Sequence, residues 1–183
     1  VQVPAGTSPG TYILAAEAGT DWDDVVQLSL REGLSGLEAL SGIPGRVGGT
    51  PIQNVGAYGV LTSDTLLDVV VLDRTTGEIV RMANAELGFG RHRTSIFKRN
   101  PRFVVLEVRF ELPRSPDSAP VRYAALAERL GVAQGTRAPS TVVREAVLGL
   151  RTERGMVVDP SDHDTWSVGS FFLNPVVPAV PPQ

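Results

Sequence analysis

Glycine and proline are concentrated in residues 41–59 (SGIPGRVGGTPIQNVGAYG), between two segments with regular apolar spacing. Glycine lets a ligand approach the main chain closely, and proline fixes φ. Apolar residues spread through the run, such as Ile43 and Val47, argue against disorder. The main-chain groups and the amides of Gln53 and Asn54 can hydrogen-bond a planar polar ring. A purely structural Ω-loop is the alternative that composition leaves open.

A second group of reactive side chains lies in residues 87–98 (LGFGRHRTSIFK), where Arg91, His92, Arg93 and Lys98 share a glycine-broken loop. A guanidinium can form two parallel hydrogen bonds to a carboxylate or phosphate, so this loop could clamp an anion. The alternative is a solvated basic loop. His92 could be a base or a surface residue, and the sequence does not decide between them.

Ser170 and Asn174 place one hydroxyl and one amide in the otherwise apolar run 169–175 (GSFFLNP). A serine nucleophile is disfavoured, because no G-x-S-x-G elbow surrounds Ser170 and only His92 and His163 could act as its base. A serine that donates a proton needs no triad. A serine that only satisfies the local main chain is the alternative.

Two common cofactor motifs are missing from the sequence: G-x-x-x-x-G-K-[ST], and G-x-G-x-x-G after a strand. Phosphate binding by either cradle is therefore not supported. Asp159, Asp162, His163 and Asp164 superficially resemble a metal site. Such a cluster is more typical of a turn-rich loop, so no metal is expected.

These residues must be positioned by regular elements, and the part of the chain before residue 113 is expected to be β-rich. Apolar spacing and turn residues predict a strand at 12–18, a helix between Thr20 and Gly33, a hairpin of 66–73 with 78–82, and a strand at 103–112. The helix begins with T-D-W-D, a Thr-x-x-acid capping box.

The last of these strands, FVVLEVRFEL, alternates strictly. Apolar residues at 104, 106, 108, 110 and 112 would face the core, while Val105, Glu107, Arg109 and Glu111 would share a solvated face.

A linker is predicted at residues 113–120 (PRSPDSAP), which contain three prolines. Helices are expected at 121–130 and after Ser140, which could cap the second one, with Val142, Val143, Ala146, Val147 and Leu150 as its apolar stripe. A final strand is expected at 166–173. We therefore place a domain boundary near residue 115, dividing the chain into 1–114 and 115–183.

Composition sets limits on function. With 183 residues, 42% apolar and 20% charged, the chain can bury a real core. A net charge of −3 gives no basic field for nucleic acid, and no apolar run reaches the ~20 residues of a membrane helix. Zero cysteines fits a reducing compartment. We expect a cytoplasmic chain without nucleic-acid or membrane partners, and its ends suggest a fragment.

Three segments in this order resemble the UDP-N-acetylenolpyruvoylglucosamine reductase family: residues 41–59, RTSIFK (93–98) and GSFFLNPVV (169–177). WDDVV (22–26) and DHDTWSVGS (162–170) are similar to actinobacterial members. The resemblance implies an α+β fold, with a β-rich FAD subdomain of the vanillyl-alcohol-oxidase type followed by a smaller α+β substrate domain. Residues 1–114 would be the second lobe of the FAD-binding domain, and 115–183 an incomplete substrate-binding domain.

The same resemblance implies a monomeric oxidoreductase of peptidoglycan precursor synthesis that uses FAD and NADPH. Hydride would pass from NADPH to the flavin and then to the enolpyruvyl group of a UDP-sugar, while the protein stabilises the developing charge and supplies a proton.

Site residues are also implied by the resemblance. Ser170 would be the proton donor and Arg93 would neutralise the substrate carboxylate. The expected flavin contacts are Ser41, Gly42, Ile43, Pro44, Gly45, Gly48, Gly49, Gln53, Asn54, Gly56, Ala57, Tyr58 and Val105. The expected substrate contacts are Tyr58, His92, Arg93, Arg154, Ser170 and Asn174.

Some positions depart from the family pattern. His92 stands where the family usually has tyrosine, and Leu173 where many members have lysine. A second catalytic acid would lie beyond Gln183, and an N-terminal flavin subdomain is missing, so this segment alone is expected to be weak or inactive. Two alternatives stay open: another FAD-dependent oxidase or dehydrogenase of the same fold, and a truncated module that binds without catalysis.

Overall fold

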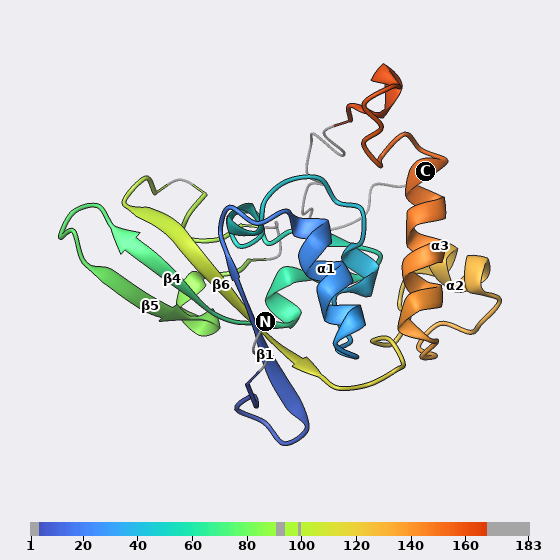
Figure 1. The fold of residues 1–183 in the computed structure, drawn as a ribbon, viewed down its shortest axis with the longest axis horizontal. Coiled ribbons are helices and arrows are strands. Elements are labelled where there is room, and N and C mark those ends of the chain that lie inside the picture. The colour runs from blue at the N-terminus through green and yellow to red at the C-terminus, as the bar shows by residue number, and fades with distance from the viewer. Residues whose placement is uncertain (1–3, 91–93, 99, 168–183) are drawn as a thin grey trace, which may run out of the picture.

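The computed structural model describes residues 4–90, 94–98 and 100–167. Its larger sheet has the strand order β1-β6-β4-β5, and every neighbouring pair is antiparallel. The four strands are β1 (Thr11–Glu17), β4 (Leu66–Asp73), β5 (Ile79–Ala83) and β6 (Phe103–Pro113). The expected first strand, hairpin and long strand are therefore confirmed, and Figure 1 shows β6 running between β1 and β4.

Helix α1 (Trp22–Arg31) covers one face of this sheet, where the Trp22 ring lies 5.7 Å from that of Phe110 on β6. Its buried stripe is apolar except for Ser29, and it ends before Gly33, as predicted. The predicted capping box is wrong. The N-cap is Asp21, which makes no side-chain cap bond and pairs with Arg46. The Asp23 carboxylate, the acid of the predicted box, binds Arg144 and the main chain of Gly42.

Strand β6 does not alternate as strictly as its sequence. A bulge between its pairings with β4 places Val105 opposite Val71 and Glu107 opposite Val70. The inward face therefore changes: Val105 is buried, whereas Val104 and Leu106 are exposed. The charged face is not simply solvated either, because Arg109 forms a bidentate ion pair with Asp68 on β4.

Shorter elements connect these strands. A two-stranded sheet joins β2 (Gly56–Ala57) to β3 (Val60–Leu61). Single 3₁₀ turns lie at η1 (Glu38–Leu40), η2 (Val47–Gly49), η3 (Thr62–Asp64), η4 (Asn84–Leu87) and η5 (His163–Thr165).

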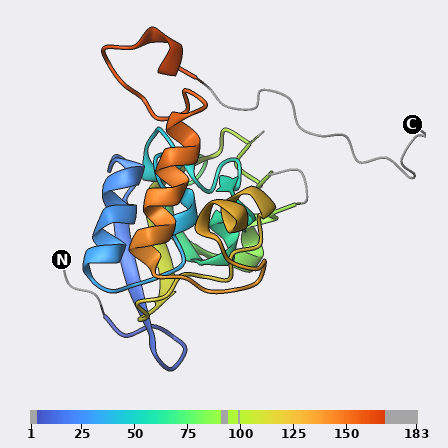
Figure 2. The same ribbon diagram turned by 90° about the vertical axis from the view of Figure 1, so that its right-hand side faces the viewer.

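Two helices follow the sheet, α2 (Ala124–Leu130) and α3 (Ser140–Thr152). Helix α2 begins three residues later than the start predicted at residue 121, and it ends at Gly131 in the left-handed conformation. The predicted cap of α3 is wrong: Pro139 is the N-cap, and the Ser140 hydroxyl is buried without a hydrogen-bond partner among the described residues. Val142 of the predicted stripe is 44% exposed, while Val143, Val147 and Leu150 are buried. Figure 2 shows α3 beside α1.

Residues 113–120 are more firmly held than a linker. The main-chain N–H of Ser118 donates to Ala138, and that of Ala119 donates to the buried carboxylate of Glu38. The members of one apolar cluster lie between Leu14 and Leu112 in the sequence, and those of a second lie between Val121 and Leu150. Residues 113–120 connect the two clusters. A division near residue 115 stays a prediction.

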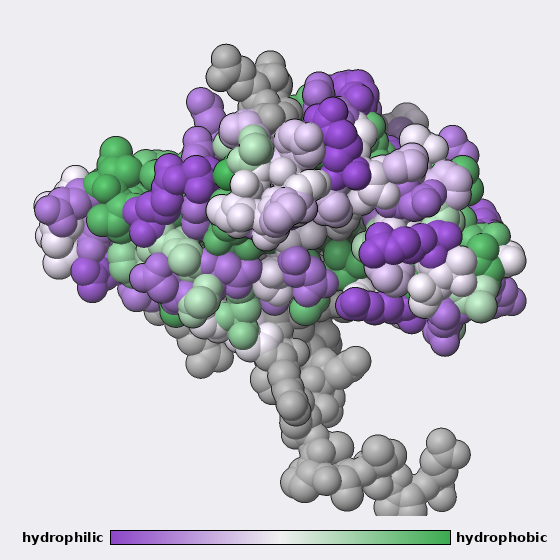
Figure 3. Space-filling model, turned by 90° about the horizontal axis from the view of Figure 1, so that it is seen from below, coloured by the Kyte–Doolittle hydropathy of each residue, from purple (hydrophilic) through white to green (hydrophobic). Residues whose placement is uncertain are grey.

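The predicted final strand lies mostly outside the described residues, and its first residue, Trp166, follows η5 outside any strand. No helix among residues 4–90, 94–98 and 100–167 is long and apolar enough to cross a membrane. Figure 3 shows apolar surface at the end of the molecule that carries the β4–β5 hairpin.

Candidate functional site

The glycine-rich segment 41–59 wraps around the start of α1. Two of its glycines are needed for close packing inside the protein: a Cβ on Gly42 would lie 2.7 Å from Leu148 of α3, and one on Gly48 would lie 2.6 Å from the Cβ of Ala18. Gly45 and Gly49 differ, because a Cβ on either would meet no atom within 4 Å. At these two positions the main chain faces open space and is accessible to a ligand.

The two amides of this segment have different surroundings. Asn54 is buried, and its side chain both donates to the hydroxyl of Ser63 and accepts from the main-chain N–H of Ser63. Its amide therefore holds the loop together. Gln53 is exposed. The next expected motif lies beside this loop, since the hydroxyl of Ser95 donates to the carbonyl of Ile52 at 2.8 Å.

Tyr58 adopts φ of 50°, a left-handed conformation that costs a non-glycine residue about 1–3 kcal/mol. Its ring meets that of Tyr123 edge-on, with centroids 5.5 Å apart. Burial raises the pKa of its hydroxyl, and the positive charges of Arg151 and Arg154 oppose that rise. The phenol is therefore neutral at pH 7 and can donate a hydrogen bond beside two cations.

Arg151, at the end of α3, is buried, and its Nη2 donates to the carbonyl of Met156 at 2.8 Å. Its Nε has no hydrogen-bond partner among the described residues. Burial lowers the pKa of this guanidinium, while Tyr58 and Asp23 oppose the shift. An unsatisfied donor of a buried cation, next to a neutral phenol, is suited to binding an anionic group.

Asp23 fixes the relative positions of these parts. Its carboxylate accepts two hydrogen bonds from Arg144 of α3, at 2.8 and 2.6 Å, and one from the N–H of Gly42 at 2.8 Å. Burial raises the pKa of Asp23, but these hydrogen bonds outweigh it, and the pKa lies below its ordinary value. One carboxylate thereby links α1, the glycine-rich segment and α3.

The structure thus brings together the expected flavin residues of segment 41–59, with Tyr58 near Arg151 and Arg154. Val105 is buried on β6, in the apolar cluster of the sheet. Four expected site residues lie outside the described residues, and their positions stay predictions: His92, Arg93, Ser170 and Asn174.

Sequence reasoning missed Asp23, Arg144, Arg151 and Tyr123. Arg151 carried a signal, because it follows Val147 by one helical turn and so puts a charge on the buried stripe of α3. The pairing of Asp23 with Arg144 carried none, since 121 residues separate the two.

The aspartates of residues 159–164 are used in local turns. The Asp159 carboxylate accepts from Ser161, and that of Asp162 from the N–H of Asp164. Across the described ranges, no group of three or more His, Cys, Asp or Glu residues could hold a metal ion.

Comparisons with known proteins agree with this architecture. The FAD binding domain family matches residues 7–83. The UDP-N-acetylenolpyruvoylglucosamine reductase of Nocardia farcinica is 55% identical over 96% of this chain, and that of Mycolicibacterium smegmatis is 58% identical over 88%. The crystal structure of the same reductase from Thermus caldophilus covers 77% of this chain and 42% of its own, with a TM-score of 0.54 and 28% identity.

The fold is α+β, and residues 7–83 match the FAD binding domain family. The chain is a relative of the UDP-N-acetylenolpyruvoylglucosamine reductases, as its motifs predicted. It matches only 46% of the length of each of these two relatives, so it spans about half of them.

Proposed function

We propose that this chain is the part of an NADPH-dependent, FAD-containing reductase that converts UDP-N-acetylglucosamine enolpyruvate to UDP-N-acetylmuramate. The observation that carries the proposal is the exposed main chain at Gly45 and Gly49, which is tied through Asp23 to the helix bearing Arg151. The main-chain groups can hydrogen-bond a neutral ring. The cations next to them can bind an anionic substrate. The reaction belongs to cytoplasmic synthesis of peptidoglycan precursors, and we propose a monomer.

The residues of segment 41–59 fit a flavin. Bulky side chains at positions 45 and 49 would fill the space that the two glycines leave open, and Gln53 is exposed beside them. We assign the flavin contacts to the main chain of this segment and to Gln53, whereas Asn54 acts by holding the loop. Bound FAD supplies the transfer of hydride from NADPH to the enolpyruvyl carbon.

The nucleotide-sugar part of the substrate is assigned to Tyr58 and Arg154, with Asn174 and His92 as further contacts. A neutral Tyr58 donates a hydrogen bond to a phosphate oxygen, and Arg154 supplies the charge. Arg93 neutralises the substrate carboxylate, and Ser170 gives a proton to the carbon next to it. We also propose the division into flavin lobe 1–114 and substrate lobe 115–183.

Measuring the two half-reactions separately in the full-length enzyme tests the role of Ser170. Ser170→Ala should leave flavin reduction by NADPH nearly intact and slow reduction of the enolpyruvyl ether by orders of magnitude. The matched control is Ser167→Ala, a nearby serine to which we assign no chemistry. An equal loss in both half-reactions would show that Ser170 is structural.

Arg93→Lys should also slow the second half-reaction, because a point charge cannot replace a bidentate fork. Full activity of that variant would remove Arg93 from the site.

A flavin oxidase or dehydrogenase for another substrate is the competing function. An absorbance spectrum distinguishes the two: in the proposed enzyme, the flavin band bleaches with NADPH and recovers when the UDP-sugar enolpyruvyl ether is added without oxygen. Recovery with an alcohol or sugar instead would favour the competitor, and a well-folded protein without flavin would favour a non-catalytic binding module.

A further inference from the structure

A cavity of about 410 Å³ lies beyond the C-terminal end of α1, whereas Gly42 and Gly45 of the glycine-rich segment contact the start of this helix. Ser35 and Gly36, just beyond the helix, form part of its wall, whereas Asp23 in the first turn contacts Gly42. Ten residues of helix separate the two ends, about 15 Å at 1.5 Å per residue. The cavity is therefore remote from Asp23 and Gly42. Another part of its wall, at Val60 and Arg122, adjoins the end of the glycine-rich segment, where a Cβ on Gly59 would lie 3.2 Å from the Cβ of Arg122.

Two hydroxyls in the cavity wall have no hydrogen-bond partner. The Oγ of Ser35, a residue with 1% exposure, and the Oγ1 of Thr65 are both buried and unpaired within the described part of the chain. Buried polar side-chain atoms are nearly always hydrogen-bonded, and only four are unpaired in this part. Two of these four belong to one cavity, which indicates a site that receives an acceptor.

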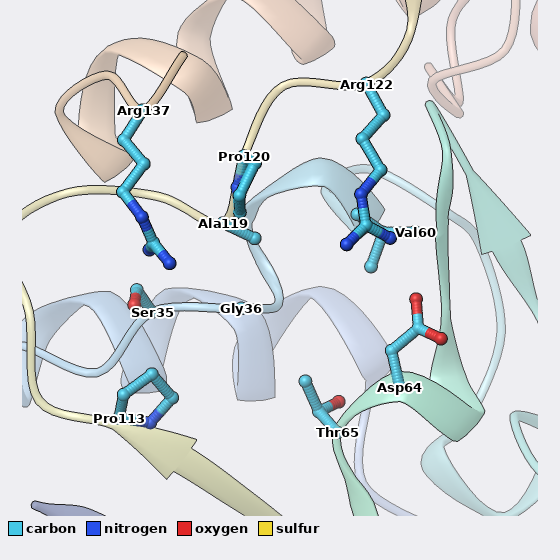
Figure 4. A pocket seen from close by; sticks show the side chains of 10 residues that line it. All are labelled: Ser35, Gly36, Val60, Asp64, Thr65, Pro113, Ala119, Pro120, Arg122 and Arg137. Carbon is cyan, nitrogen blue, oxygen red and sulfur yellow. The ribbon is translucent and has the colours of Figure 1, made fainter. Parts of the chain in front are cut away.

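Two arginines enter the same cavity from the segment around α2 (Figure 4). Arg137 uses Nη1 to donate to the carbonyl of Ser118 at 2.8 Å, which leaves the other donors of its fork available. Within the described ranges, neither Arg122 nor Arg137 forms an ion pair with a carboxylate. The cavity thus offers charged donors on one wall and hydroxyl donors on the opposite wall.

Two carboxylates lie at or behind the cavity wall, and each accepts hydrogen bonds from the main chain. Asp64 on the facing wall accepts from the N–H of Leu61. Glu38 lies behind the wall and accepts from the N–H groups of Gly36 and Ala119. These bonds hold the two acids against the main chain, so the arginines and hydroxyls supply the free donors.

We propose that this cavity binds a small molecule through a phosphate group. A carboxylate has two oxygens in one plane and can accept hydrogen bonds from donors on one wall. A phosphate is tetrahedral and can accept from guanidinium groups and hydroxyls that approach from opposite sides. The ligand bridges the end of the β-rich part, through Ser35 and Thr65, and the segment that carries Arg122 and Arg137. Its occupation therefore strengthens the contact between these two parts of the chain.

The test is calorimetric titration of the chain with inorganic phosphate at constant ionic strength, set by chloride. All proteins carry Arg154→Met, so that phosphate at the proposed nucleotide-sugar residues does not contribute. Arg137→Met should weaken binding about tenfold, and Ser35→Ala about threefold, because each removes a donor to a charged acceptor. Arg81→Met, which removes an exposed arginine of β5, is the matched control and should bind as the parent does.

Acetate is titrated in parallel and should bind much more weakly than phosphate. If a variant fails to fold by circular dichroism, Arg122→Met and Thr65→Val replace Arg137→Met and Ser35→Ala. The proposal is overturned if the parent does not bind phosphate, if acetate binds equally well, or if the cavity variants bind like Arg81→Met. Those results would leave a cavity whose hydroxyls are satisfied by water.

Discussion

Asp23 is the residue on which the arrangement of the candidate site depends most directly. Replacing it by alanine removes both bonds to Arg144, whose side chain is only 16% exposed, and leaves the N–H of Gly42 without its acceptor. We expect a loss of about 2 kcal/mol in the free energy of unfolding, typical of hydrogen bonds to charged groups. Urea unfolding measures it, and a double-mutant cycle with Arg144→Met isolates the pair.

Asp24→Ala is the control for that measurement. Asp24 lies in the same first turn of α1 and shares its favourable position near the helix dipole, but it is exposed. If both substitutions cost the same, the contribution of Asp23 comes from the helix dipole and the link to α3 has no stabilising role.

Glu111 predicts a pH dependence. Hydrogen bonds from the side chains of Thr11 and Thr7, with N–H groups of Ser8 and Thr7, lower the pKa of this carboxyl from 4.5 to about 2. Because the folded-state pKa is depressed, this stabilisation is full above about pH 4.5 and is lost as the pH falls towards 2.

Glu111→Gln should therefore lower Tm by a few degrees at pH 7, and by progressively less between pH 4.5 and 2. Thermal unfolding followed by circular dichroism across this range measures the difference. A difference between the two proteins that does not change with pH would contradict the assigned role.

At the scale of elements, the bulge in β6 makes neighbouring valines unequal. Val105 is 9% exposed and Val104 is 43% exposed. Threonine has nearly the same shape as valine, so Val105→Thr buries a hydroxyl and should cost about 1–3 kcal/mol, while Val104→Thr should be within about 0.5 kcal/mol of the parent. Denaturant unfolding of the two variants measures these losses. A larger loss for Val104→Thr than for Val105→Thr would indicate that β6 alternates strictly, as its sequence predicts.

The same strand shows what the sequence could and could not predict. The existence of β6 followed from its composition, but FVVLEV has apolar residues on both faces, so the sequence alone does not locate a bulge. Likewise, Thr20 and Asp23 match a capping box locally, and a contact with Arg144 in another helix overrides it. Motifs 41–59, 93–98 and 169–177 predicted the family, whereas the cavity between Ser35 and Arg137 joins segments that no local pattern connects.

At the scale of the molecule, Glu38 connects the two apolar clusters. It is 1% exposed, one carboxylate oxygen accepts from Gly36 and the other from Ala119, and α3 packs on the 3₁₀ turn that contains it. Glu38→Gln replaces one acceptor oxygen by an NH₂ group that faces an N–H. We expect a loss of about 2 kcal/mol and weaker coupling between the clusters.

Two probes can follow the clusters separately in a Trp166→Phe background, where buried Trp22 is the one remaining tryptophan of two. Its fluorescence reports on the first cluster, and Tyr123→Trp, added in a second protein with Trp22→Phe, reports on the exposed start of α2. Because Trp22→Phe itself lowers stability, each fluorescence curve is compared with the circular dichroism curve of the same protein. With Glu38 present the two curves of each protein should coincide; with Glu38→Gln the α2 probe should unfold at lower urea than the circular dichroism signal of its own protein. Curves that stay coincident in the variant would mean that the apolar contacts of α3 couple the clusters without Glu38, and curves already separate in the parent would mean that the two clusters unfold independently.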